Sequence, residues 1–174
     1  MRAARLLVAA LLCCAAAGCG GDGVEPRQWA RSVCTALTPW RAEIADLTAK
    51  AQQQLQAART PAETKTNIVE LLDGAESASE KARAGVDGAG VPDVEDGKKV
   101  AEQFTASLSK ARDAYGNAKR TVSELPTADG KAFYAAVGKA FTTLKDDYER
   151  SAIDPAHTGP ADLQRAFDEV PECR

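Results

Sequence analysis

The feature that most constrains the fold is a regular spacing of apolar residues in the middle of the chain. Between residues 100 and 125, apolar side chains recur at steps of three or four residues, which is the period of an α-helix. These positions are Val100, Phe104, Leu108, Ala111, Tyr115, Ala118, Val122 and Leu125. Such a stripe suits packing against nearly antiparallel neighbouring helices. Pro126 directly after it predicts the helix end.

Further segments of the chain carry the same helical period. The first contains Val33, Leu37, Trp40, Ile44, Leu47, Ala51 and Leu55, the second Ile68, Leu71, Leu72, Ala75, Ala78 and Ala82, and the fourth Phe133, Val137, Ala140, Phe141, Leu144 and Tyr148. A short fifth segment contains Leu163, Phe167 and Val170. No stretch alternates as a strand would. We therefore expect an all-α fold, an antiparallel up-down four-helix bundle with a short fifth C-terminal helix.

Residues at the ends of these segments predict the helix boundaries. Thr60-Pro61-Ala62-Glu63 has the pattern of a capping box with proline at the first helical position. Thr127 is expected to cap the fourth helix, and the glycines between residues 85 and 92 predict a loop. Pro39 either kinks one long first helix, which we favour, or separates two helices.

The two tryptophans have different expectations. Trp40 shares the helical spacing of Val33 and Leu37 and is expected in the core. Trp29 precedes this stripe, at the first turn of the helix. It could cover the base of the bundle or lie at a membrane interface, because an indole combines an apolar body with a polar N–H.

The first 18 residues have the organisation of a secretory signal peptide. Arg2 and Arg5 form a basic start, and residues 6–17 form an uncharged apolar run that ends in small residues. Twelve residues are too few for a membrane span, which needs about 20. We expect residues 1–18 to be removed and to take no part in the mature fold.

Two cleavage positions are compatible with the residues that follow. Ala15-Ala16-Ala17 fits the small-residue rule for a soluble secreted protein. Ala16-Ala17-Gly18-Cys19 resembles the bacterial lipobox, with Ala16 where leucine is usual, and that resemblance implies a diacylated Cys19 at the new N-terminus. We favour lipidation, with residues 19–28 as a flexible tether and residues 29–174 as the helical bundle domain.

The cysteine count agrees with lipidation. Cys13 and Cys14 would leave with the signal peptide, and Cys19 would carry lipid. Cys34 and Cys173 would then remain, and an even pair in an oxidising compartment predicts a disulfide. Simple secretion would leave a third cysteine without a partner.

Charge and composition argue against several classes of function. Loss of Arg2 and Arg5 changes the formal net charge from −3 to −5, and no basic block occurs, so we expect no nucleic acid partner. Aromatic residues make up only 5% of the chain, whereas alanine is abundant. Alanine-rich helices can approach closely and leave little room for a large internal cavity.

Candidate catalytic and metal-binding residues are sparse. The one histidine, His157, lies in a loop rich in proline and glycine, so no catalytic residue is expected. Asp93, Glu95 and Asp96 superficially suggest a calcium loop, but the twelfth position counted from Asp93 is Phe104, where an EF-hand needs glutamate. We expect neither a metal nor a cofactor, and we interpret the three acids as stabilising a helix N-terminus.

The chain as a whole resembles the small secreted proteins and lipoproteins of actinobacteria. The resemblance is carried by the lipobox, the Gly/Asp tether, the start Trp29-Ala30-Arg31-Ser32-Val33-Cys34, the alanine-rich helices and the cysteine near the end. It implies anchoring to the outer face of the cell membrane, with secretion as the alternative, and no established activity. We expect a non-enzymatic protein that binds membrane lipid through Cys19 and also an envelope protein or wall polymer. A small-ligand carrier or sensor with a site between the helices is the alternative.

Overall fold

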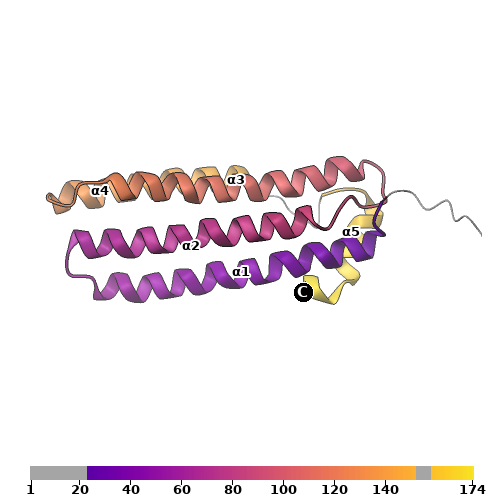
Figure 1. Cartoon of the computed structure of the whole chain (residues 1–174), viewed down its shortest axis with the longest axis horizontal. Coiled ribbons are helices and arrows are strands. Elements are labelled where there is room, and N and C mark those ends of the chain that lie inside the picture. The colour runs from indigo at the N-terminus through magenta and orange to yellow at the C-terminus, as the bar shows by residue number, and fades with distance from the viewer. Residues whose placement is uncertain (1–22, 152–157) are drawn as a thin grey trace, which may run out of the picture.

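The chain is all-helical. The computed structural model describes residues 23–151 and 158–174. It contains α1 (Pro26–Ala57), α2 (Pro61–Asp87), α3 (Gly97–Glu124), α4 (Gly130–Ser151), α5 (Ala161–Glu169) and a terminal 3₁₀ turn, η2 (Pro171–Cys173) (Figure 1). No strand occurs in these residues, which hold only an isolated pairing between Val24 and Pro92. The predicted fold class, all-α, is confirmed.

Consecutive long helices lie side by side in a helical bundle. α1 packs on α2, α2 on α3 and α3 on α4, while α5 and η2 pack against the first part of α1 (Figure 1). The most extensive contact joins α2 and α3. Within the described ranges, the backbones of α1 and α4 make no close contact.

The start of α2 follows the predicted capping box. The hydroxyl oxygen of Thr60 accepts a hydrogen bond from the backbone N–H of Glu63 at 3.2 Å. In return, the carboxylate of Glu63 accepts from the N–H groups of Thr60 at 3.1 Å and Arg59 at 2.6 Å. Pro61 occupies the first helical position, where no backbone donor is needed.

Two predicted boundaries are wrong by a few residues. α4 is capped by Asp129, not by Thr127, because the carboxylate of Asp129 accepts from the N–H of Ala132 at 3.0 Å. α2 continues to Asp87, past Gly85, where the loop was expected to begin. Its last turn is retained because Val86 is 1% exposed and belongs to the core.

Pro39 lies inside α1, which runs through it without a break. The alternative of two separate helices is therefore wrong. Because proline has no N–H, the carbonyl of Thr35 receives no helical hydrogen bond from position 39. α1 packs against α2 on both sides of Pro39, with Ala36 next to Gly85 and Leu47 next to Gly74, and this packing supports the continuous helix.

The folded body begins at Val24, inside the segment 19–28 that was expected to be a flexible tether. The N–H of Val24 donates to the carbonyl of Val91, and the N–H of Asp93 donates to the carbonyl of Val24, both at 2.7 Å. α1 then starts at Pro26, with the carboxylate of Glu25 accepting from its first N–H groups. Val24 is thus held by hydrogen bonds, Glu25 caps α1 and residues 26–28 belong to this helix, so residues 24–28 do not form part of a flexible tether.

The buried apolar residues form two clusters at opposite ends of the molecule. The disulfide-end cluster combines residues of α1, α2, α3 and α5 with Val170 and includes Trp29, Phe104 and Phe167. The turn-end cluster combines residues of α2, α3 and α4, from Ile68 to Leu144, near the α1–α2 and α3–α4 turns. α2 and α3 contribute to both clusters, which explains why they form the central pair.

Candidate functional site

The predicted disulfide is present. The sulfur atoms of Cys34 in α1 and Cys173 in η2 are 2.01 Å apart, and 139 positions separate them in the sequence. The hydroxyl of Thr38 donates to the carbonyl of Glu172 at 3.0 Å beside it. The bond joins the first helix to the last turn of the described chain and holds α5 against α1.

Trp29 lies in the core next to this disulfide. Its side chain is fully buried, and its indole Nε1–H donates to the carbonyl of Gly90 at 2.8 Å. Its ring meets Phe104 and Phe167 edge-on, with centroid distances of 5.3 and 5.9 Å. The structure therefore places Trp29 at the base of the bundle. Of the two positions considered from the sequence, the base of the bundle and a membrane interface, this is the first.

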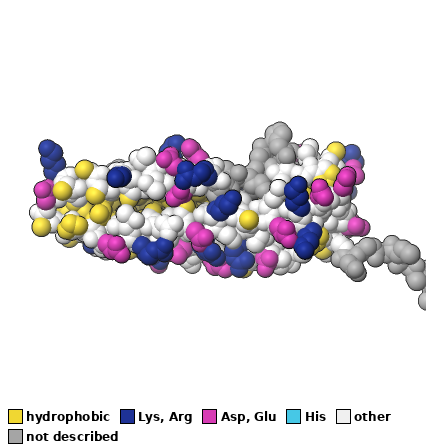
Figure 2. All heavy atoms as spheres, turned by 90° about the horizontal axis from the view of Figure 1, so that it is seen from above, with side chains coloured by type: hydrophobic (Ala, Val, Ile, Leu, Met, Phe, Trp, Pro, Cys, Tyr) yellow, Lys and Arg dark blue, Asp and Glu magenta, His cyan; other side chains and the backbone are white. Residues whose placement is uncertain are grey.

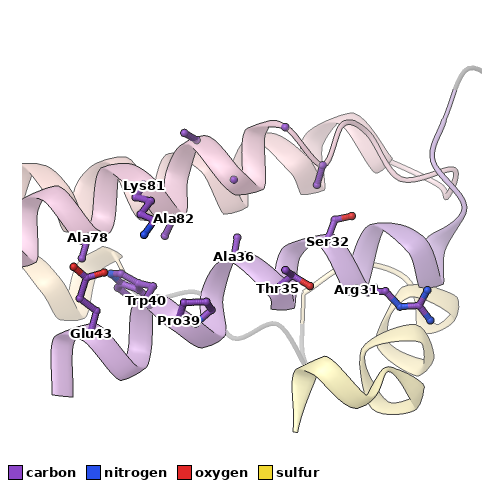
Figure 3. A pocket seen from close by; sticks show the side chains of 14 residues that line it. Arg31, Ser32, Thr35, Ala36, Pro39, Trp40, Glu43, Ala78, Lys81 and Ala82 are labelled. Carbon is purple, nitrogen blue, oxygen red and sulfur yellow. The ribbon is translucent and has the colours of Figure 1, made fainter. Parts of the chain in front are cut away.

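A groove runs along the surface between α1 and α2. It has a volume of about 590 Å³ and is shown from close by in Figure 3. Most of its lining is apolar and small, including Ala36, Ala78, Ala82, Ala84 and Gly88. We refer to it below as the α1–α2 groove.

The small residues that line this groove also set the separation of the two helices. A Cβ atom added to Gly85 would lie 2.8 Å from the Cβ of Ala36, so the helices approach too closely there for a larger residue. Glycine and alanine leave a shallow channel along such a contact because they fill little of the space beside it. The sequence indicated the close approach but not the surface channel.

Trp40 and Pro39 lie toward one end of the α1–α2 groove. The indole Nε1–H of Trp40 donates to the hydroxyl of Ser79 at 3.1 Å, and that hydroxyl donates to the carbonyl of Ala75 at 2.8 Å. Ser79 is fully buried, so this chain of hydrogen bonds fixes the orientation of the ring. Trp40 is half-buried and packs against the disulfide-end cluster, so it is partly core and partly groove wall.

Charged side chains lie along the rim of the α1–α2 groove. Arg31 is 3.4 Å from a carboxylate oxygen of Glu172. Lys81 extends from α2 toward Trp40 (Figure 3), and its amino group forms no hydrogen bond or ion pair with any described residue. Glu43 lines the groove as well, beside Trp40 (Figure 3), so the groove combines an apolar floor with side chains of both charges at its rim.

The exposed faces of α2 and α3 are joined by ion pairs. The amino group of Lys119 lies 2.9 Å from a carboxylate oxygen of Asp73 and 2.5 Å from one of Glu76. Arg112 lies 2.7 Å from Glu80 across the same two helices. Positive and negative side chains are accordingly interspersed along the face seen in Figure 2. The ion pairs connect the two helices, and the face seen in Figure 2 has charges of both signs side by side.

The carboxylate of Glu80 should titrate at unusually low pH. Hydrogen bonds from Arg83 and then Arg112 lower the pKa of Glu80 from 4.5 to about 2. Because the pKa is lower in the folded state, the contribution of these bonds to stability is present above pH 4.5 and is lost as the pH falls toward 2. An NMR titration of the Glu80 carboxyl carbon should give a midpoint near 2, and Arg112→Gln should raise it. A wild-type midpoint near 4.5 would contradict the assignment.

Several residues considered in the sequence lie outside the described ranges or form no site. Cys19 and His157 are both outside those ranges. Asp96 directly precedes α3, but its side chain makes no capping hydrogen bond. In the part of the chain that the structure describes, no three His, Cys, Asp or Glu residues are grouped to hold a metal ion. No helix there combines the length and hydropathy needed to cross a membrane.

Comparisons of the chain with protein-family models, curated proteins and solved structures found no match. No relative therefore indicates a substrate, ligand or partner for any part of this molecule. The disulfide, the hydrogen-bonded N-terminal segment and the α1–α2 groove are the features on which a function can be proposed.

Proposed function

We propose that this protein is a non-enzymatic lipoprotein anchored to the outer face of the cell membrane, where it binds another envelope component. The single observation that carries the proposal is the pairing of Cys34 with Cys173. A disulfide is typical of proteins outside the cytoplasm. Its formation leaves Cys19 as the one unpaired cysteine after the signal peptide, at the position where the lipobox pattern requires it.

The proposed arrangement of the mature protein is an up-down four-helix bundle with its disulfide end toward the membrane. Only three residues lie between Cys19 and Gly23, and Val24, directly after Gly23, is the first hydrogen-bonded residue of the body. Fully extended, the chain from Cys19 to Gly23 reaches about 14 Å. The lipid anchor would therefore keep the end that contains Trp29 close to the bilayer.

A small-ligand carrier remains the second candidate function, and the α1–α2 groove favours it. The groove volume of about 590 Å³ lies within the range of roughly 300–1,000 Å³ that is usual for small-molecule sites. Its mostly apolar lining, with a few polar groups at the rim, is also typical of such sites. A carrier role and a membrane anchor are compatible, because the anchor precedes the helical body in the chain.

The anchor can be tested with Cys19→Ala. We expect the wild-type protein from its native envelope to partition into detergent and to carry the mass of a diacylated N-terminal cysteine. Cys19→Ala should lose both properties while keeping the disulfide, because residue 19 precedes the folded body. Intact mass spectrometry and detergent-phase partitioning measure the two properties.

Cys14→Ala is the matched control for this experiment. Residue 14 lies in the expected signal peptide, so this variant should yield the same mature mass and partitioning as the wild type. An unmodified wild-type mass that starts at Gly18 would exclude the lipid anchor and leave a secreted protein.

A further inference from the structure

We propose that the Trp40 end of the α1–α2 groove binds a small betaine, a zwitterion that carries a trimethylammonium group and a carboxylate. The inference deepens the second candidate function, the small-ligand carrier, and rests on that function. It does not depend on the lipid anchor at Cys19. The ligand class follows from the side chains that lie at this end of the groove.

Side chains of opposite charge lie at this end of the groove without pairing. Glu43 lines it from α1, beside Trp40, and Lys81 extends toward Trp40 from α2 (Figure 3). Neither charged side chain forms an ion pair or a hydrogen bond with a described residue, and both are exposed. A ligand with one cationic and one anionic group would therefore meet a partner for each.

The opposite end of the groove has a different lining. Arg31, the third charged side chain of the described lining, is 3.4 Å from a carboxylate oxygen of Glu172. Ser32 and Thr35 add hydroxyl groups there, and the floor between the two ends consists of alanine and glycine. The unpaired charges of the described lining are thus confined to the Trp40 end, where we place both charged groups of the ligand.

Trp40 offers an aromatic ring in a fixed orientation beside these charges. Its indole N–H donates to the hydroxyl of Ser79 at 3.1 Å, and that hydroxyl donates to the carbonyl of Ala75 at 2.8 Å. Because Ser79 is fully buried, the ring cannot turn away without losing this bond. Tryptophan attracts a cation to its ring more strongly than tyrosine or phenylalanine does. A cationic group held by Glu43 would thus have a second, preorganised contact.

The lining favours a trimethylammonium group over a primary ammonium group. A primary ammonium group has three N–H donors, and each of them needs an acceptor. Among the described lining residues next to Trp40, the side chains of Pro39, Ala78 and Ala82 offer none, and Glu43 supplies one carboxylate. A trimethylammonium group has no N–H donor, so its methyl groups can contact the ring and these apolar side chains without cost.

The position of the site favours a dissolved betaine over the head group of a membrane lipid. The groove ends at Gly88, three residues before Val91, whose carbonyl accepts from the N–H of Val24 at the start of the folded body. Ala78, beside the proposed site (Figure 3), is ten positions earlier in the chain, about 15 Å along α2. The charged groups of the ligand would therefore bind on the side of the groove that is remote from the expected anchor.

An NMR titration of the mature full-length protein in maltoside micelles tests the proposal. Glycine betaine is added while the indole Nε1–H signal of Trp40 is followed, with the signal of the fully buried Trp29 as the internal reference. We expect a saturable shift with a Kd on the order of 1 mM, because the charged contacts are exposed. tert-Butylacetate has the same shape and carboxylate but a neutral carbon in place of the nitrogen, so it should bind about fivefold more weakly.

Charge-neutralising variants identify the groups that hold the ligand. Glu43→Gln should weaken the binding of glycine betaine about threefold and leave that of tert-butylacetate unchanged, whereas Lys81→Gln should weaken both. Asp46→Asn is the matched control, because it removes the same charge from an exposed position on the next turn of α1 that does not line the groove. It should leave the Kd for glycine betaine unchanged. Equal effects of Glu43→Gln and Asp46→Asn would overturn the proposal, since the attraction would then not be specific to the groove.

The choice of ligands separates this inference from the carrier function on which it rests. Absence of a Trp40 shift with glycine betaine, or equal binding of glycine betaine and tert-butylacetate, would overturn the betaine assignment. If tert-butylacetate still shifts the signal, the groove remains a small-ligand site. A shift with phosphatidylcholine vesicles but not with glycine betaine would identify a lipid head group and would also overturn the assignment. The anchor is decided separately, by the mass of the N-terminal cysteine.

Discussion

Removal of the Cys34–Cys173 disulfide is expected to lower the free energy of unfolding by about 4–5 kcal/mol. The bond closes a loop across 139 positions of the chain, which is nearly the whole domain. In the chain-entropy model, a crosslink of this length stabilises the fold because it removes many conformations from the unfolded chain. Thermal unfolding of the double variant Cys34→Ala/Cys173→Ala should therefore have a midpoint about 10–20 °C below that of the wild type.

Chemical reduction gives the control for this prediction. Dithiothreitol should lower the unfolding midpoint of the wild type to nearly that of the double variant and should not change the double variant itself. A loss of less than about 1 kcal/mol would contradict the prediction, because it would mean that the crosslink constrains the unfolded chain very little.

Trp29→Ala should destabilise the protein by about 3–5 kcal/mol. The substitution removes a fully buried ring from between Phe104 and Phe167 and leaves a cavity at the disulfide end. It also leaves the carbonyl of Gly90 without the indole donor that it has at 2.8 Å. Urea unfolding followed by circular dichroism measures the change in the unfolding free energy.

Two further variants separate the contributions of Trp29. Trp29→Phe retains an aromatic ring but loses the hydrogen bond to Gly90, so its cost should be smaller, about 1–3 kcal/mol. Trp40→Ala removes the same side chain from a half-buried position and should cost less than Trp29→Ala. Equal losses for Trp29→Ala and Trp40→Ala would contradict the burial difference on which the prediction depends.

Helix positions could be predicted because local chemistry determines them. Apolar spacing located the four long segments, and the capping box at Thr60 fixed the start of α2 to the residue. The end of α3 near Leu125 follows from Pro126 in the same way. The cap of α4 was missed because Thr127 and Asp129 are both good capping residues, and the local pattern does not distinguish between them.

Features that depend on contacts between distant residues could not be predicted from local patterns. The position of Val24 depends on its pairing with Val91 and Asp93, about 70 residues later, which no periodicity reveals. The α1–α2 groove depends on the contact of Ala36 with Gly85, and alanine carries no sequence signal for a ligand site. The Cys34–Cys173 pair was the exception, because elimination of the other cysteines left one pairing.

The two apolar clusters imply an order of folding for a chain that emerges N-terminus first. The turn-end cluster is complete once Leu144 is present, so it can form before residues 145–174 appear. The disulfide-end cluster needs Phe167 and Val170, so Trp29 lacks part of its surroundings until the last residues arrive. Folding of this end must therefore wait for the whole chain, and the unpaired Cys34 thiol remains open to other thiols throughout that interval.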